Sequence, residues 1–114
     1  MSDCLFCRIV AGEIPAKKIH EDDHTVAFHD LHPQAPTHVL VIPKRHIPAF
    51  AALGAADAET LGALAVAVNA VAQAQGLGES GFRVVCNNGR DAGQTVDHLH
   101  WHVLGGRALA WPPG

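Results

Sequence analysis

The chain has 114 residues, which is the size of a single domain, and we therefore expect one domain over residues 1–114. Apolar residues make up 48% and charged residues 17% of the sequence, which excludes the polar, highly charged composition of disordered chains. The net charge of −3 argues against non-specific binding to nucleic acid, because such binding needs a basic surface.

The cysteine content and the N-terminal residues predict where in the cell the protein is located. Three cysteines are too few for a secreted disulfide scaffold. The start, Met1-Ser2-Asp3, has neither the basic nor the apolar region of a signal peptide. No apolar run reaches the ~18 residues of a membrane helix. We therefore expect a cytoplasmic protein without a membrane segment.

Short strands alternate with turns in the first half of the chain. Residues 4–11 form a short segment of one or two helical turns that ends at Gly12. Alternating and β-branched residues then predict strands over residues 17–21, 25–29 and 38–42, and later over residues 82–86. Pro43 ends the third of these strands.

One long helix is predicted over residues 57–75. Its apolar residues recur at three- and four-residue spacing, at Leu61, Leu64, Val68 and Val71. Asp57 is a suitable N-cap and Gly76 a suitable C-terminal stop. We interpret the stripe as a packing face. Residues 96–104 alternate polar and apolar side chains, as a half-covered strand does. Five strands and one long helix predict an α+β domain around an antiparallel sheet.

Histidine occurs nine times, more often than Lys and Arg together at eight. Three histidines alternate with apolar residues over residues 98–103, so in a regular strand they share one face. Neighbouring histidines would then lie ~7 Å apart and the outer two ~13 Å apart. Zinc–nitrogen bonds are only ~2.0–2.1 Å long, so one metal ion cannot hold all three. The three imidazoles are expected to divide their work.

The loop before this segment carries glycines that favour an anion site. Gly89, Gly93 and the amides around Gln94 and Thr95 can form a nest of backbone donors. A nest beside a row of imidazoles suggests a phosphate held in front of a nucleophile. The alternative is a solvated strand face with histidines, preceded by an ordinary turn, since many turns carry two glycines.

A second site is suggested by Cys4 and Cys7, which are separated by two residues as in one half of a zinc site. The alternative is a pair of small buried thiols in a packed turn, because no second pair follows at standard spacing. Cys86 lies within a predicted strand and is expected to be buried and inert.

The run His98-Leu99-His100-Trp101-His102-Val103-Leu104 resembles the signature of the histidine triad family, hydrolases and transferases that act on nucleotide α-phosphates. The resemblance is to its nucleotide-binding branch, which contains purine nucleoside phosphoramidases, and it covers residues 4–114. It is carried by residues 5–9, 13–16, 27–30, 33–38, 41–44, 91–102, 104–107 and 111–114.

The resemblance implies cleavage of the P–N bond of purine nucleoside 5′-phosphoramidates, with adenosine preferred. His100 matches the nucleophile that forms a covalent nucleotidyl intermediate, and His102 matches a phosphate contact. His38 matches a histidine that hydrogen-bonds to the row; read from the sequence alone, it could equally be a buried core histidine. Thr95 stands where this branch usually has serine, and its hydroxyl would donate a proton to the departing amine.

The resemblance also implies the remaining contacts. The purine pocket would comprise Phe6, Ile9 and Phe28, the ribose site Asp30 and Leu31, and the phosphate and leaving-group contacts Asn87, Gly93, Gln94 and Thr95, with His100 and His102. Trp111 would reach the active site of a partner subunit. A structural zinc ion would be held by Cys4, Cys7, His46 and His98. Trp101 and Asp97 depart from the residues usual at their positions, which is expected to change the packing beneath the site.

The long helix can cover only part of a five-stranded sheet, so apolar area remains to be buried. The family buries it in a homodimer with one continuous ten-stranded sheet.

The resemblance also implies the ligand, an AMP-like purine nucleotide, with no nucleic acid and no membrane partner. Two alternatives remain: a dinucleoside polyphosphate hydrolase, and a non-catalytic zinc- and nucleotide-binding adaptor.

Overall fold

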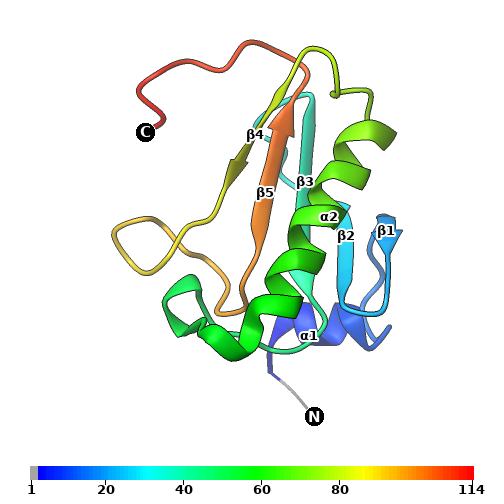
Figure 1. The fold of residues 1–114 in the computed structure, drawn as a ribbon, viewed down its shortest axis with the longest axis vertical. Coiled ribbons are helices and arrows are strands. Elements are labelled where there is room, and N and C mark those ends of the chain that lie inside the picture. Colours follow the sequence, from blue (N-terminus) through cyan, green and yellow to red (C-terminus); the bar gives the residue numbers. More distant parts are fainter. Residues whose placement is uncertain (1–2) are drawn as a thin grey trace.

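The structure is a computed structural model that describes residues 3–114. Met1 and Ser2, two of the residues on which the expectation of no signal peptide rests, lie outside the described residues. Five antiparallel strands form one sheet in the order β1-β2-β3-β5-β4, so the predicted α+β architecture is confirmed (Figure 1). The elements are α1 Leu5–Val10, β1 Lys18–Glu21, β2 Thr25–His29, β3 Thr37–Pro43, α2 Ala58–Ala74, β4 Phe82–Val85 and β5 Trp101–Gly105, with 3-10 turns η1 Phe50–Ala52 and η2 Ala55–Asp57.

The two faces of the sheet carry separate apolar clusters. Helix α2 packs on one face, over a core that includes Ala27, Val39, Val41, Leu64, Val71, Leu99 and Val103. Helix α1 packs on the other face, over Phe6, Ile9, Val26, Phe28, Leu40 and Ile42. Alternation along β2 and β3 sends consecutive side chains to opposite clusters. Because α1 has only six residues, it covers one end of its face and leaves the rest open.

The N-terminal end of α2 differs in part from the expectation, whereas its C-terminal end agrees with it. Asp57 is the N-cap residue of α2, as predicted, but its side chain makes no capping hydrogen bond to that helix. Its carboxylate accepts a hydrogen bond from the Gly54 N–H at 2.9 Å and another from Arg45, so it closes the preceding turn η2 instead. At the other end Gly76 has φ +72°, and the Leu77 N–H donates to the Ala72 carbonyl at 2.8 Å. The predicted glycine stop is confirmed as a Schellman motif.

The last strand is shorter than the predicted 96–104. Strand β5 pairs with β3 only from Trp101, which lies opposite Val41. Strand β3 ends at Pro43, so the residues before Trp101 have no part of β3 to pair with. They lie instead beside the segment that follows β3, where the Leu99 N–H donates to the Ile47 carbonyl at 2.6 Å. The alternation of faces persists, and the side chains of His100 and His102 lean together, with 5.1 Å between their ring centroids.

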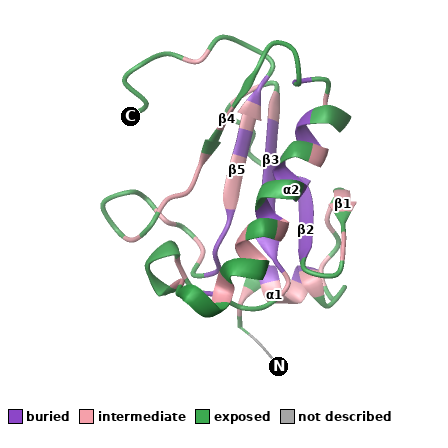
Figure 2. Cartoon of the chain, viewed as in Figure 1, coloured by how far each residue is buried: buried purple, intermediate pink, exposed green. Residues whose placement is uncertain are grey.

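In the part of the chain that the structure describes, Ala55–Ala74 is one helix whose length and apolar composition would suffice to cross a membrane. This corrects the expectation that no apolar segment is so long. Leu64, Ala67 and Val71 are completely buried against the sheet, which is the behaviour of a core helix. The opposite side of the helix is exposed, and Val66 there keeps 67% of its accessible surface (Figure 2).

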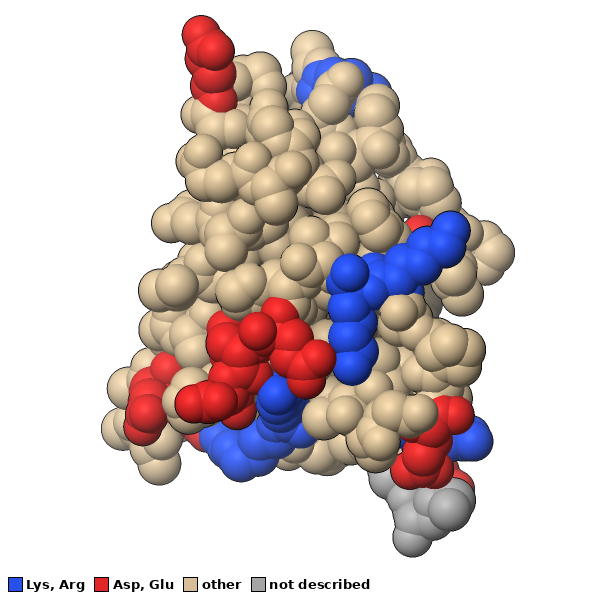
Figure 3. Space-filling view, turned by 90° about the vertical axis from the view of Figure 1, so that its right-hand side faces the viewer, with Lys and Arg blue, Asp and Glu red and all other residues tan. Residues whose placement is uncertain are grey.

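Charged residues of both signs lie together on the surface. Figure 3 shows Lys and Arg side chains among Asp and Glu side chains in the lower half of the face that it draws. Lys18 and Lys44 both pair with Glu21, at 3.2 Å and 3.0 Å. The face drawn there is therefore not a uniformly basic surface.

Candidate active site and metal centre

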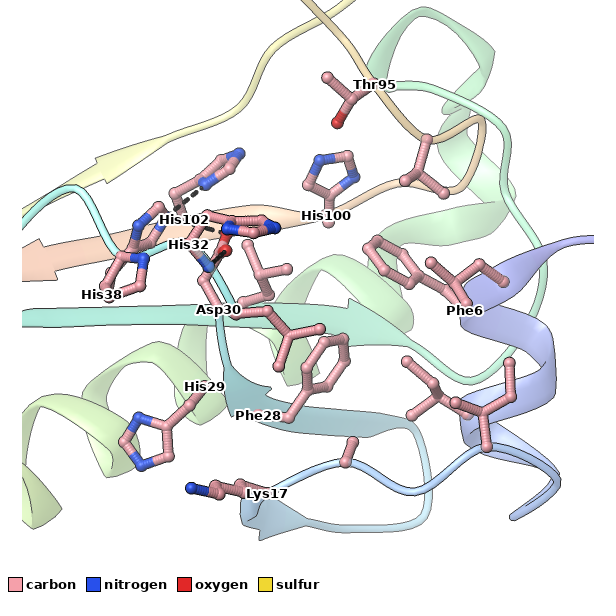
Figure 4. Close-up of a pocket in the computed structure, with 18 of the residues that line it drawn as sticks. Phe6, Lys17, Phe28, His29, Asp30, His32, His38, Thr95, His100 and His102 are labelled. Carbon is pink, nitrogen blue, oxygen red and sulfur yellow. Dashed lines mark hydrogen bonds and ion pairs between the residues drawn. The ribbon is translucent and has the colours of Figure 1, made fainter.

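A cavity of about 750 Å³ lies on the open part of the α1 face. Its wall comes from α1, the segment before β1, the end of β2 and the loop after it, β3, and residues 95–102. The residues that the sequence predicted and that line it are Phe6, Ile9, Phe28, Asp30, Leu31, His38, Thr95, His100 and His102. Figure 4 shows the rings of His100 and His102 and the Thr95 hydroxyl on one side, with Phe6 beside His100 and Phe28 across the cavity from Thr95.

The tautomer of His100 follows from its hydrogen bond. Its Nδ1 lies 2.7 Å from the backbone carbonyl oxygen of His98. A carbonyl can only accept, so Nδ1 carries the proton and Nε2 keeps its lone pair. The ring is 4% exposed and stands edge-on to Phe6, with 5.3 Å between ring centroids. In the neutral ring this hydrogen bond therefore leaves Nε2 as the nucleophilic nitrogen.

A chain of hydrogen bonds fixes the orientation of His102. The Gln34 N–H donates to His38 Nδ1 at 3.0 Å, so the proton of a neutral His38 sits on Nε2. That Nε2–H donates to His102 Nδ1 at 2.8 Å, which leaves the His102 proton on its own Nε2. Among the described residues this buried Nε2–H has no acceptor. His102 therefore offers a donor to a ligand, whereas His100 offers a lone pair.

Burial keeps the His102 and His38 rings uncharged at neutral pH. It lowers the pKa of His102 from 6.5 to about 4. The rings of His100 and His38 also lower this pKa, whereas the Asp30 carboxylate raises it. Burial also lowers the pKa of His38, again opposed by the Asp30 carboxylate. A bound phosphate would therefore meet neutral hydrogen-bonding groups here.

Asp30 occupies the middle of the cavity wall. One carboxylate oxygen accepts from the His32 N–H at 2.8 Å, and the other lies 3.5 Å from His38 Nε2. Asp30, His38 and His102 lie close enough together to be considered as metal ligands. The Gln34 bond places a proton on His38 Nε2, however, so this nitrogen has no lone pair for a metal. The trio is better described as a hydrogen-bonded chain.

Three nitrogen-bearing residues of the cavity wall were not singled out from the sequence, namely Lys17, His29 and His32. The His29 N–H donates to the Lys17 carbonyl at 3.1 Å, and His32 follows the turn that Asp30 closes. Strand pairing and turn geometry bring these residues to the cavity, and no spacing rule in the sequence signals them.

The loop itself uses three of the backbone N–H groups that were predicted to form the nest, and the phosphate-binding role of this loop stays a prediction. The Gly89 N–H donates to the Gln94 side-chain oxygen at 2.9 Å, the Gly93 N–H to the Arg90 carbonyl at 3.0 Å, and the Gln94 N–H to the Gly89 carbonyl at 3.0 Å. The side-chain nitrogen of Gln94, Nε2, also donates to the backbone carbonyls of Pro48 and Val96. Asn87, Gly93 and Gln94 are not among the cavity-lining residues, whereas Thr95 is.

The C-terminal segment lies outside the cavity of its own chain. Trp111 is 79% exposed, and the Arg83 guanidinium carbon lies 5.9 Å from the centre of its ring. Arg83 also donates to the Ala110 carbonyl at 3.0 Å. The contact of Trp111 with a partner subunit stays a prediction.

On the far side of His98 lies a second cluster, formed by Cys4, Cys7, His46 and His98. His98 Nδ1 is 3.3 Å from Cys4 Sγ, 3.5 Å from Cys7 Sγ and 3.2 Å from His46 Nδ1. Cys7 Sγ is 3.2 Å from His46 Nδ1. The chain brings together all four residues that were predicted as metal ligands, from positions 94 residues apart.

The donor set and its spacing fit a zinc ion. Tetrahedral zinc with two sulfur and two nitrogen ligands separates its ligand atoms by about 3.3–3.8 Å, which is close to the distances found here. His98 Nε2 lies 2.8 Å from the Pro43 carbonyl oxygen, so it donates its proton there and directs the Nδ1 lone pair toward the cluster. The geometry is thus compatible with a four-ligand zinc centre.

Trp101 and Cys86 lie beneath the histidine segment. The Trp101 side chain packs against the α2 cluster, on the face opposite to the cavity, beside Cys86. Burial raises the pKa of the Cys86 thiol, which therefore stays protonated. The expectation that Cys86 is inert agrees with this raised pKa, but Cys86 is only partly buried and lies just beyond β4.

Comparison with known proteins gives a consistent result. The family model of the HIT domain matches residues 11–109. An uncharacterised HIT-like protein of Synechocystis is 49% identical over 98% of this chain and 97% of its own length. The crystal structure of a HIT family hydrolase from Legionella pneumophila is 48% identical, with a TM-score of 0.96, over 98% of this chain and all of that chain.

Two further solved structures are similar to this chain. A histidine triad nucleotide-binding protein from Candida albicans is 34% identical over 96% of this chain and 83% of that chain, with a TM-score of 0.83. A zinc-bound histidine triad family protein from Mycobacterium smegmatis is 36% identical over 92% of this chain and 76% of that chain, with a TM-score of 0.81. With its histidine row, its fold and these relatives, the chain belongs to the HIT domain family.

Proposed function

We propose that the protein is a nucleotide hydrolase that cleaves the P–N bond of purine nucleoside 5′-phosphoramidates, with adenosine preferred. The observation that carries this proposal is the tautomer of His100. Its Nδ1–H is held by the His98 carbonyl, and its ring lines a cavity whose wall continues from Phe6 into aromatic and aliphatic residues. A neutral imidazole with a free nitrogen is the form that nucleophilic catalysis requires.

In the proposed reaction His100 Nε2 attacks the α-phosphorus and forms a P–N bond to the ring. The bond to the departing amine breaks, and its electron pair leaves with the nitrogen, which takes up a proton. Thr95 is the proposed donor to that nitrogen, and the His102 Nε2–H is the proposed donor to a phosphate oxygen. Water then attacks the nucleotidyl-histidine, releases the nucleoside monophosphate and restores His100.

The rest of the cavity suits a purine nucleoside. Phe6 and Phe28 meet edge-to-face with 5.5 Å between ring centroids, and Ile9 adds an aliphatic surface. Such a wall can cover a purine ring, while Asp30 can accept hydrogen bonds from ribose hydroxyls. The nucleotide-binding relative from Candida albicans and the hydrolase relative from Legionella pneumophila support this assignment.

The decisive experiment compares two substrates in one preparation. We expect turnover of adenosine 5′-phosphoramidate to exceed that of a diadenosine polyphosphate, and a guanosine phosphoramidate to be turned over more slowly. Faster cleavage of the polyphosphate would replace the proposal by the dinucleoside polyphosphate hydrolase. AMP binding without turnover of either compound would indicate the non-catalytic adaptor.

We further propose that Cys4, Cys7, His46 and His98 hold one structural zinc ion. Two thiolates and two neutral imidazoles leave no open coordination position, which is the arrangement of a structural site. When bound, the ion would cross-link α1, the segment after β3 and the histidine segment. The zinc-bound relative from Mycobacterium smegmatis supports the metal assignment.

A homodimer is the proposed assembly, with the single domain spanning the chain. The outer face of α2 is apolar and exposed, and the edge strand β4 leaves Phe82 37% and Val84 42% exposed. Pairing two β4 edges would give the ten-stranded sheet and cover these side chains. Light scattering at micromolar concentration should give the mass of two chains, and the mass of one chain would contradict the assembly.

A further inference from the structure

We propose that Cys4 and Cys7 form an oxidisable pair, which a peroxide converts to a disulfide with release of the bound metal ion. The first support is the position of the two sulfurs. Both lie within 3.5 Å of the same nitrogen, His98 Nδ1, and all four ligand atoms of the cluster lie within 4.8 Å of one another. The two sulfurs therefore lie at most 4.8 Å apart, and a disulfide bond of about 2.05 Å requires them to approach by less than about 3 Å.

The second support is access from solvent. A cavity of about 630 Å³, separate from the proposed active site, is lined by Cys4 and His46, with Asp3 and Asp97 at its wall. Cys4 and Cys7 are both partly exposed, and His46 is exposed. The two carboxylates disfavour anionic oxidants but leave a small neutral peroxide free to reach the sulfur. Cys86 is also partly exposed, but desolvation raises the pKa of its thiol, which therefore stays protonated and reacts poorly.

The peroxide is the oxidant that accepts the electrons released in this step. One cysteine sulfur attacks a peroxide oxygen, the O–O bond breaks, and a sulfenic acid and hydroxide form. The second sulfur attacks the sulfenic sulfur, the S–S bond forms, and a second hydroxide leaves. Two electrons pass from the two thiolates to the peroxide, while zinc is not reduced or oxidised. The ion loses two of its four ligands and dissociates.

The cluster is connected to the proposed nucleophile through His98. The His98 ring belongs to the cluster, while its backbone carbonyl accepts the Nδ1–H of His100 at 2.7 Å. Thr95 and Val96 also line both cavities, so this segment is the wall between them. Oxidation should therefore loosen the orientation of His100, and His98 acts here as a positioning residue. This part of the inference rests on the proposed function.

The test uses the zinc-loaded chain with Cys86→Ser, in which Cys4 and Cys7 are the remaining cysteines. Hydrogen peroxide should release zinc to a coloured chelator and give a mass lower than that of the reduced chain by two hydrogen atoms. A dithiol reductant and zinc should restore the starting state. Cys7→Ser in the same background is the matched control and must not form the intramolecular disulfide.

Two results would overturn the disulfide. One is retention of zinc and of both thiols at a peroxide concentration that oxidises a small thiol. The other is a gain of oxygen atoms without an S–S bond. If Cys7→Ser does not fold, peptide mapping of the oxidised wild-type chain gives the same answer, because a Cys4–Cys7 bridge lies within one short peptide.

The connection to His100 has its own readouts. Oxidation should change the ring nitrogen resonances of His100 and lower turnover about threefold, less than the roughly 10–100-fold typical of losing an outer-shell partner. Unchanged resonances after complete disulfide formation would overturn the connection. A chain that shows no turnover before oxidation would disprove the proposed function, whereas zinc release would still test the disulfide.

Discussion

His98 and His100 are two residues apart, both buried, and each donates one ring proton to a backbone carbonyl. The bonded nitrogen differs: it is Nε2 in His98 and Nδ1 in His100. The remaining lone pair of His98 faces two sulfurs and a second imidazole, whereas the ring of His100 borders a cavity with apolar walls. The same side chain is thus prepared for metal binding in one place and for nucleophilic attack in the other.

The comparison shows that the backbone carbonyl selects the chemistry of each ring. A carbonyl acceptor fixes the tautomer, and the tautomer decides which way the lone pair points. The surroundings of that lone pair then determine whether a metal ion or a phosphorus atom is the natural electrophile. Four experiments test this difference in role between the metal cluster and the cavity.

The largest effect is expected for His100→Ala. The substitution removes the attacking nitrogen but little of the nucleoside-binding wall, so turnover should fall by at least about 10³-fold while AMP affinity changes little. Steady-state kinetics and calorimetry measure the two quantities. His24→Ala is the control, since His24 pairs with Glu59 on the surface and does not line the cavity. Near-normal turnover in His100→Ala would disprove the covalent mechanism.

Metal removal should act mainly on stability. Protein purified without chelators should contain about one zinc ion per chain, and a metal present at a hundred times its Kd stabilises the fold by about 2.7 kcal/mol. A strong chelator or Cys4→Ser should therefore lower the Tm by roughly 10 °C and reduce turnover much less. Elemental analysis without zinc, together with two readily titrated thiols in the folded chain, would exclude the site.

The pH dependence of stability should report the buried ring of His102. Its pKa is about 4 in the folded chain and 6.5 when unperturbed, so the unfolded chain binds more protons between these values. The contribution of His102 is complete above pH 6.5 and is lost as the pH falls toward 4. Urea unfolding of the wild type and of His102→Asn should show the steeper decline on acidification in the wild type. Parallel curves would contradict the depressed pKa.

The smallest effect is expected for the C-terminal segment. Deletion of residues 108–114 removes Trp111, which is exposed and contacts Arg83, so the fold should persist with little loss of stability. If Trp111 reaches the cavity of a partner, the deletion should change the preference between small and bulky amine leaving groups. Competition between two phosphoramidates measures that preference, and an unchanged ratio would place the tail outside the site.

Local patterns in the sequence determined a large part of this molecule. The three- and four-residue spacing of Leu61, Leu64, Val68 and Val71 predicted α2, and its apolar side does pack on the sheet. Alternation over residues 98–103 correctly separated the three histidines from Leu99, Trp101 and Val103. These features depend on the period of a helix or an extended chain, which neighbouring residues fix by themselves.

Tertiary structure decided what the histidines can do. The sequence could not show that β3 ends at Pro43 and offers its carbonyl to His98, because this contact spans 55 residues. It could not show that the Gln94 side chain accepts the Gly89 N–H that had been assigned to phosphate, or that Gln34 sets the tautomer of His38. Tautomers and lone-pair directions follow from hydrogen-bond partners, and those partners meet only when distant segments pack together.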